Sequence, residues 1–184
     1  MRTVRREEIV DYQTYDEGRA ALREEVMAEK ADRRIHVGEC LTFLFETHAT
    51  MRYQIQEMMR AERIVREAEI LREIETYNEL LGGPGELGCT LLIELDDAAE
   101  RDRRLREWRD LSRHLYVRLE DGEQVYASFD PRQVGDERLS SVQYLKFSVG
   151  GRAPAALGAD HPKLSAETVL SDAQRAALAK DLAS

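Results

Sequence analysis

Two hydrophobic periodicities follow one another along this chain, and their order constrains the fold more than any other feature. Apolar residues recur at helical spacing through the first half, most clearly from Met51 to Leu81. In the second half, residues 142–149 alternate between apolar and polar, and Asp121-Gly122 between two apolar runs is typical of a β-hairpin. Helices followed by hairpin-linked strands predict an α+β fold, with a mostly antiparallel sheet and helices packed on one face.

Capping signals and glycines predict where the helices begin and end. Thr14-x-x-Glu17 has the form of a capping box and predicts a helix that runs to about residue 32. The longer helical signal fits either one curved helix or two helices broken near residues 64–68, and it ends at Gly82-Gly83-Pro84-Gly85. Two further helices are expected after Asp97 and Ser171. Extended segments are expected at residues 35–37, 41–45, 89–95, 115–119, 124–128, 142–149 and 168–170.

Length and charge limit the organisation and the partners. The 184 residues suit a single domain over 1–184, in which a helical half (about 1–113) and a sheet-rich half (about 114–184) are not independent. The net charge of −9 argues against a nucleic-acid partner, because a polyanion would be repelled on average. Arg106, Arg109 and Arg113 share one helix face, but acidic residues lie beside them, so we interpret them as solvated surface residues.

The cysteines and apolar runs indicate the compartment. Cys40 and Cys89 lie far apart in predicted strands, where reduced thiols behave as small apolar side chains. The first ten residues have no apolar core of a secretory signal, and the longest apolar runs are too short to span a bilayer. We therefore expect a cytoplasmic protein without a membrane partner. The oligomeric state stays open.

The helical stretch after Phe45 carries polar residues that are candidates for a site. Glu62 falls near the centre of the apolar stripe, where a carboxylate needs a partner, and Arg66 at i+4 would supply one as a structural ion pair. Other polar residues of this helix lie on its opposite side. If a second layer covered that side, a pocket for a ligand or partner would be lined by Gln54, Glu57 and Arg60 together with Glu62.

Glutamates from neighbouring elements extend this hypothesis to a metal. Glu46 at a strand end and Glu94 from another strand would join Glu57, and His161 or His48 would supply a nitrogen ligand. Carboxylate and imidazole ligands suit iron or manganese. Solvated or ion-paired surface groups are the more usual explanation of such glutamates, and the Glu-x-x-His pattern of di-iron helical bundles does not occur in the sequence.

Several strings resemble one known bacterial family. They are Phe45-Glu46, Thr50, the run from Arg52 to Met58 with Arg60 and Glu62, Tyr77-Asn78, Thr90, Glu94, Ser141-Val142 and Asp160-His161-Pro162. Together they resemble the "domain of unknown function 3501" family over nearly the whole chain. Where family members often continue Tyr-Asn into a leucine-isoleucine-proline turn, this chain has Leu80-Leu81 followed by Gly82.

The resemblance implies a cytoplasmic bacterial protein with no settled activity or cofactor. Members of the family are often encoded beside rubrerythrin-like proteins and iron–sulfur oxidoreductases. This gene neighbourhood implies an accessory or interaction protein in a redox or oxidative-stress system. The alternative, from the residues themselves, is a small metal- or anion-binding enzyme or sensor that uses Glu46, Glu57, Arg60 and Glu94.

Overall fold

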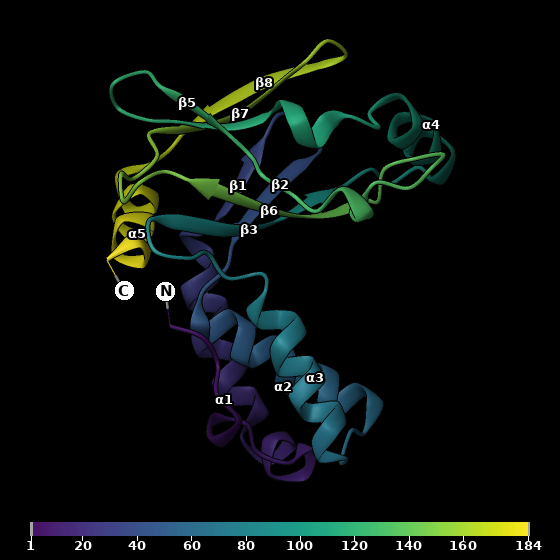
Figure 1. The fold of residues 1–184 in the computed structure, drawn as a ribbon, viewed down its shortest axis with the longest axis vertical. Coiled ribbons are helices and arrows are strands. Elements are labelled where there is room, and N and C mark those ends of the chain that lie inside the picture. The colour runs from purple at the N-terminus through teal and green to yellow at the C-terminus, as the bar shows by residue number, and fades with distance from the viewer. Residues whose placement is uncertain (1, 184) are drawn as a thin grey trace.

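The computed structural model describes residues 2–183, and the chain forms two β-sheets with a helical bundle at one end (Figure 1). The helices are α1 (Tyr12–Ala31), α2 (His48–Glu62), α3 (Glu67–Asn78), α4 (Ala98–Glu107) and α5 (Asp172–Leu182), with short 3₁₀ turns η1 (Arg6–Glu8), η2 (Leu111–His114) and η3 (Pro131–Gln133). The strands are β1 (Arg34–Val37), β2 (Leu41–Phe45), β3 (Glu86–Ile93), β4 (Leu115–Arg118), β5 (Gln124–Tyr126), β6 (Val142–Ser148), β7 (Ala156–His161) and β8 (Leu164–Val169).

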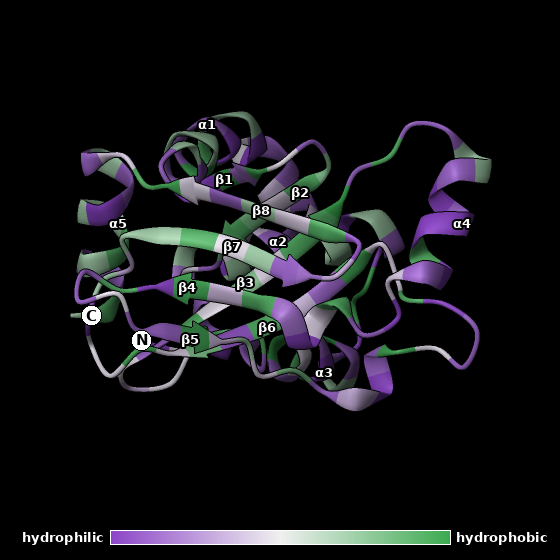
Figure 2. Ribbon diagram, turned by 90° about the horizontal axis from the view of Figure 1, so that it is seen from above, coloured by the Kyte–Doolittle hydropathy of each residue, from purple (hydrophilic) through white to green (hydrophobic). Residues whose placement is uncertain are grey.

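All strand pairs within the two sheets are antiparallel. The first sheet has the order β1-β2-β3-β6 and the second has the order β5-β4-β7-β8, which Figure 2 shows from the side of the second sheet. The sheets also meet at their edges. Ser128 forms a bridge to Lys146 of β6, and the Thr168 hydroxyl on β8 donates to the His36 carbonyl on β1 at 2.8 Å. The edge strands are therefore joined to the facing sheet.

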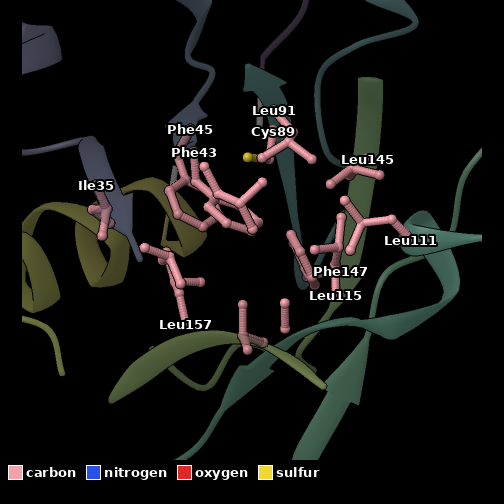
Figure 3. Packing of buried hydrophobic residues seen from close by; sticks show 14 of the residues in the cluster. Ile35, Phe43, Phe45, Cys89, Leu91, Leu111, Leu115, Leu145, Phe147 and Leu157 are labelled. Carbon is pink, nitrogen blue, oxygen red and sulfur yellow. The ribbon is translucent and has the colours of Figure 1, made fainter. Parts of the chain in front are cut away.

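The main hydrophobic core lies between the sheets (Figure 3). Phe43 and Phe45 of β2 are fully buried against Phe147 of β6, and the rings of Phe45 and Phe147 are 6.2 Å apart. Leu115 and Leu157 of the second sheet close the core from the other side. Because successive strand residues point to opposite faces, this alternation fixes which residues of each strand enter the core.

The helical bundle has a second hydrophobic cluster. Met51, Ile55 and Met59 of α2 pack with Ile70 and Ile74 of α3. The break between the two helices lies at residues 63–66, where Arg63 adopts a left-handed conformation (φ 53°) and its backbone N–H bonds to Met59. The two-helix alternative for this stretch is therefore the one that forms.

The α+β class is confirmed, and the structure adds detail that the sequence did not predict. The strands form two sheets instead of one, and β7 was not expected. The first long helix begins at Tyr12, because Asp11 and not Thr14 accepts the first free N–H groups. The predicted caps at Asp97 and Ser171 are present. Within residues 2–183, no helix combines the length and the apolar character needed to cross a membrane.

Candidate functional site

Glu46 is a buried carboxylate at the junction of β2 and α2. Glu46 is 5% exposed, and its two carboxylate oxygens accept hydrogen bonds from Thr90 Oγ1 at 2.6 Å and Thr50 Oγ1 at 2.7 Å. Burial raises the pKa of Glu46, which the two threonine hydroxyls and the charge of Lys30 partly oppose. The local fold explains the position, because Thr47 caps α2 one residue later and turns the chain out of the sheet.

Glu57 joins α2 to α1. Arg19 Nε and Nη2 donate to its two oxygens at 2.7 and 2.9 Å, and the Tyr15 hydroxyl donates at 2.6 Å. The Arg19 hydrogen bond is the main cause that holds the pKa of Glu57 at about 2. Arg60, one turn further along α2, pairs with Asp16 of α1. These bonds form a polar seam between two helices, and both carboxylates in it are occupied by arginine.

Glu94 and His161 lie in two further networks. Glu94, after β3, accepts from Arg34 at 3.0 Å and from the Thr42 hydroxyl. His161, at the end of β7, is 4% exposed, and its Nε2 lies 3.1 Å from Asp110 Oδ1. The Lys163 backbone N–H donates to His161 Nδ1, so Nε2 carries the proton and donates to Asp110.

The structure therefore does not bring the predicted metal ligands together. Glu46, Glu57, Glu94 and His161 each have their own partners, and within residues 2–183 no group of three or more His, Cys, Asp or Glu side chains is placed to hold a metal ion. The physical reason is that the four residues belong to different parts of the fold. Glu57 faces α1, Glu46 follows β2, Glu94 follows β3, and His161 ends β7 of the second sheet.

The structure does not bring Gln54, Glu57, Arg60 and Glu62 of α2 into one pocket. Gln54 lies beside Tyr77 of α3, whereas Glu57 and Arg60 pair with residues of α1. Glu62 is exposed because α2 ends there. Arg66 lies 3.6 Å from Glu69 as an exposed ion pair, and the expected ion pair between Glu62 and Arg66 does not form.

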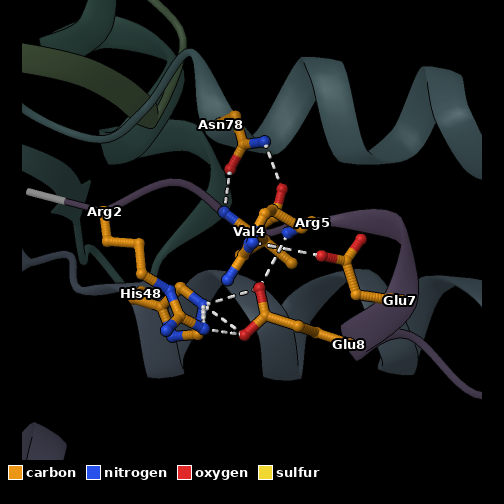
Figure 4. Close-up of polar contacts among 7 residues, drawn as sticks. All are labelled: Arg2, Val4, Arg5, Glu7, Glu8, His48 and Asn78. Atoms are coloured by element: carbon orange, nitrogen blue, oxygen red, sulfur yellow. Dashed lines mark hydrogen bonds and ion pairs between the residues drawn. The ribbon is translucent and has the colours of Figure 1, made fainter.

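Two side-chain amides from the family-like strings, Asn78 and Gln56, hold the N-terminal strap, defined as residues 2–11; Figure 4 shows the contact of Asn78. Asn78 exchanges two hydrogen bonds with the backbone of Val4, at 2.8 and 2.9 Å, and Gln56 does the same with Val10, at 2.8 and 3.1 Å. Glu8 of the strap lies 3.2 Å from His48 Nε2 at the start of α2. Asn78 and Gln56 therefore have a structural role, since they form the hydrogen bonds that the backbone of this irregular segment needs.

A cluster of titratable side chains on the second sheet was not expected, apart from His161. His114 Nδ1 lies 3.1 Å from Asp160 and its Nε2 lies 3.6 Å from Asp110, which also bonds His161. The two imidazole rings meet edge to face at 5.1 Å, and Tyr126 donates to Asp160 at 2.5 Å. Three of the four ring nitrogens have hydrogen-bond partners and the fourth, His114 Nε2, faces Asp110, so the cluster ties η2 to β7 and β5. Its hydrogen bonds join residues 34 to 51 positions apart, and sequence spacing gave no signal for them.

A cavity of about 520 Å³ lies where the end of α3 meets the outer face of β6. We call it the α3–β6 groove. It is lined by Thr76, Glu79, Leu80, Ser128, Phe129, Asp130, Gln133, Tyr144, Leu145 and Lys146. Tyr144 is 40% exposed, although Gln133 fixes its backbone through bonds to both its N–H and its carbonyl. The groove is thus an exposed aromatic and aliphatic hollow on a fixed backbone.

The fold and these sites define an α+β protein whose buried polar groups are largely paired with one another. The chain belongs to the family described as "Protein of unknown function (DUF3501)", whose model matches residues 3–182. It is similar to a novel protein of unknown function from Burkholderia pseudomallei known from a crystal structure, with 30% sequence identity and a TM-score of 0.90 over 98% of this chain and 100% of that one. No curated protein sequence matches the chain.

Proposed function

We propose that this protein is an accessory protein that docks a redox protein in the α3–β6 groove. The observation that carries the proposal is the groove itself. An accessory protein of this kind needs apolar surface that stays exposed on the isolated chain. Tyr144 is exposed in the groove, and the partly buried Phe129 and Leu80 lie beside it. Tyrosine and phenylalanine in a hollow are the residue types that anchor protein interfaces.

The charges around the groove favour a basic partner surface. Two carboxylates, Glu79 and Asp130, and one ammonium, Lys146, line it, and the whole chain carries a net charge of −9. Asp130 is paired with Arg132 at 2.8 Å, whereas no ion pair to Glu79 occurs within residues 2–183. An apolar side chain flanked by lysine or arginine would therefore fit, since complementary charges steer encounter and fix orientation.

The identity of the partner rests on the family resemblance. A rubrerythrin-like protein or an iron–sulfur oxidoreductase is the occupant that we propose. The cytoplasm is the compartment in which we expect the two to meet, because both Cys40 and Cys89 are free and buried, as suits a reducing environment. The metal-binding alternative depended on glutamates that the structure disperses, so we do not retain it.

The experiment is a binding titration between this protein and two purified redox proteins of its own organism, a rubrerythrin-like protein and an iron–sulfur oxidoreductase. Tyr144→Arg places a charge in the groove without altering the backbone bonds to Gln133, and it should weaken binding at least about tenfold, as expected for a central anchor. Val169→Arg, at an apolar residue that is 71% exposed on the second sheet, is the matched control and should bind normally.

Two outcomes would overturn the proposal. The first is no binding of either redox protein to the wild type. The second is equal loss with Tyr144→Arg and Val169→Arg, which would place the interface elsewhere.

A further inference from the structure

Two arginines after α4 lack the acidic partners that their neighbours have. Arg103 bonds Glu107 at 3.1 Å and Arg106 bonds Asp102 at 2.9 Å. By contrast, no hydrogen bond or ion pair from the side chains of Arg109 or Arg113 occurs within residues 2–183. Arg72 of α3 is also exposed without such a bond in the described part of the chain, so what distinguishes Arg109 and Arg113 is the cavity that both of them line.

These two side chains border one cavity. The cavity has a volume of about 510 Å³ and is distinct from the α3–β6 groove, although Phe129 contributes to both. Its lining consists of Arg109, Asp110, Arg113, Phe129, Pro131 and Val134. Three of the six lining residues are apolar and come from the segment 129–134, whereas the charged ones come from the other wall.

The carboxylate between the arginines is engaged elsewhere. Asp110 accepts the ring N–H of His161 at 3.1 Å and lies 3.6 Å from His114 Nε2. Both of its oxygens are thus directed to the histidine cluster. Asp110 therefore serves to hold η2 against β7, and the two guanidinium groups keep their positive charge toward the cavity.

We propose that this cavity binds an organic oxyanion, a phosphate or carboxylate group carried on an aromatic or aliphatic body. Arg109 and Arg113 would hold the oxyanion, because guanidinium donors match the oxygens of carboxylate and phosphate groups in pairs. Phe129, Pro131 and Val134 would receive the apolar body. A hollow with an apolar wall and a few convergent polar groups is the usual form of a small-molecule site.

The test is calorimetric titration of the full chain with three anions, namely phenyl phosphate, phenylacetate and inorganic phosphate. The wild type should bind at least one of the two aromatic anions saturably and more tightly than inorganic phosphate. Comparing phenyl phosphate with phenylacetate distinguishes a phosphate ligand from a carboxylate ligand.

Variants locate the site. Arg109→Gln and Arg113→Gln should each weaken binding of the aromatic anion at least about tenfold, and the double variant should abolish it. Arg72→Gln, at an exposed arginine of α3, is the charge-matched control and should bind as the wild type does. Thermal unfolding of each variant establishes that the fold is retained, which we expect because both arginines are exposed.

The proposal is overturned if the wild type shows no saturable binding of any of the three anions at about 10 mM. Binding that survives in the double variant, or that falls equally in Arg72→Gln, also overturns it. The outcome is independent of the proposed redox partner, because Tyr144→Arg lies outside this cavity and should leave anion binding unchanged.

Discussion

The side-chain amide of Asn78 pairs with both backbone polar groups of Val4, as the backbone of a neighbouring strand would. The Val4 N–H donates to Asn78 Oδ1 at 2.8 Å, and Asn78 Nδ2 donates to the Val4 carbonyl at 2.9 Å (Figure 4). This two-way bond spans 74 residues of sequence and fixes the N-terminal strap on the end of α3. Val4 is buried at 2% exposure, so its backbone groups would otherwise lie without partners.

Asn78→Leu should therefore loosen the strap. We expect a loss of about 1–3 kcal/mol in the free energy of unfolding, since two backbone groups lose their partners. Amide hydrogen exchange at Val4 should accelerate more than at residues of the sheets. Arg72→Gln on the same helix is the control and should leave both quantities unchanged. Unaltered exchange at Val4 in Asn78→Leu would mean that the bond does not hold the strap.

Gly158 and Tyr116 form a second close contact. A Cβ atom at Gly158 would lie 2.4 Å from Cζ of the Tyr116 ring, which bonds Glu167 across the strand. Gly158→Ala should thus displace the ring and cost about 1–3 kcal/mol. The same substitution in a Tyr116→Ala background should cost much less, which a double-mutant cycle by chemical denaturation measures. Additive costs would show that the ring is not what the new methyl group meets.

Local sequence signals predicted much of the fold, because they depend on residues within one turn of each other. The caps at Asp97 and Ser171 and the hairpin at Asp121-Gly122 are of this kind. Strand β7 was missed, since its Ala156-Leu157-Gly158-Ala159 start lacks β-branched residues. The division into two sheets was missed because alternation shows which residues are buried and not what covers them.

The candidate site was harder to predict for a related reason. The sequence leaves open whether the Glu57 side of its helix is covered, because its partners Tyr15 and Arg19 lie 42 and 38 residues earlier. No spacing rule connects them. The cavity bordered by Arg109 and Arg113 is likewise formed only in the tertiary structure, which brings Phe129 to its opposite wall. Arg109 and Arg113 were recognised as sharing a face, but the structure was needed to show that they lack acidic partners.

Arg33 and Asp181 form a buried ion pair that holds the C-terminal helix. Arg33 Nη2 and Nε donate to Asp181 at 2.7 and 2.8 Å, and the two side chains are 9% and 7% exposed. Asp181→Ala should cost about 3–5 kcal/mol, because the Arg33 charge stays buried without its carboxylate. Lys180→Ala, at the exposed neighbouring residue, should cost less than about 0.5 kcal/mol. Equal unfolding midpoints for the two variants would contradict this role.

Glu57 should make the protein less stable in acid. Its pKa in the folded state is lowered to about 2 from 4.5, so the stability it contributes is present above pH 4.5 and is lost as the pH falls through 2. Glu57→Gln should lower the free energy of unfolding by about 1–3 kcal/mol at pH 7. The difference from the wild type should shrink as denaturation is measured at successively lower pH between 5 and 3. A difference that is constant with pH would show that Arg19 does not hold this carboxylate.

Glu46, just before α2, should change the stability with pH in the opposite direction to Glu57, which lies within α2. Burial raises its pKa in the folded state above 4.5, so its contribution is fully present below pH 4.5 and is lost as the pH rises through the raised value. Glutamine has a similar shape and no charge to desolvate, and it keeps an acceptor and a donor for Thr50 and Thr90.

Glu46→Gln should therefore gain stability relative to the wild type as the pH rises, at up to roughly 1.4 kcal/mol per pH unit until the carboxylate ionises in the folded protein. Chemical denaturation of both proteins between pH 4 and 8 measures this difference. Its slope should be opposite in sign to that between Glu57→Gln and the wild type in acid. A difference that does not change with pH would show that the pKa of Glu46 is the same in the folded and unfolded states. The hydrogen bonds from Thr50 and Thr90 would then offset the whole effect of burial.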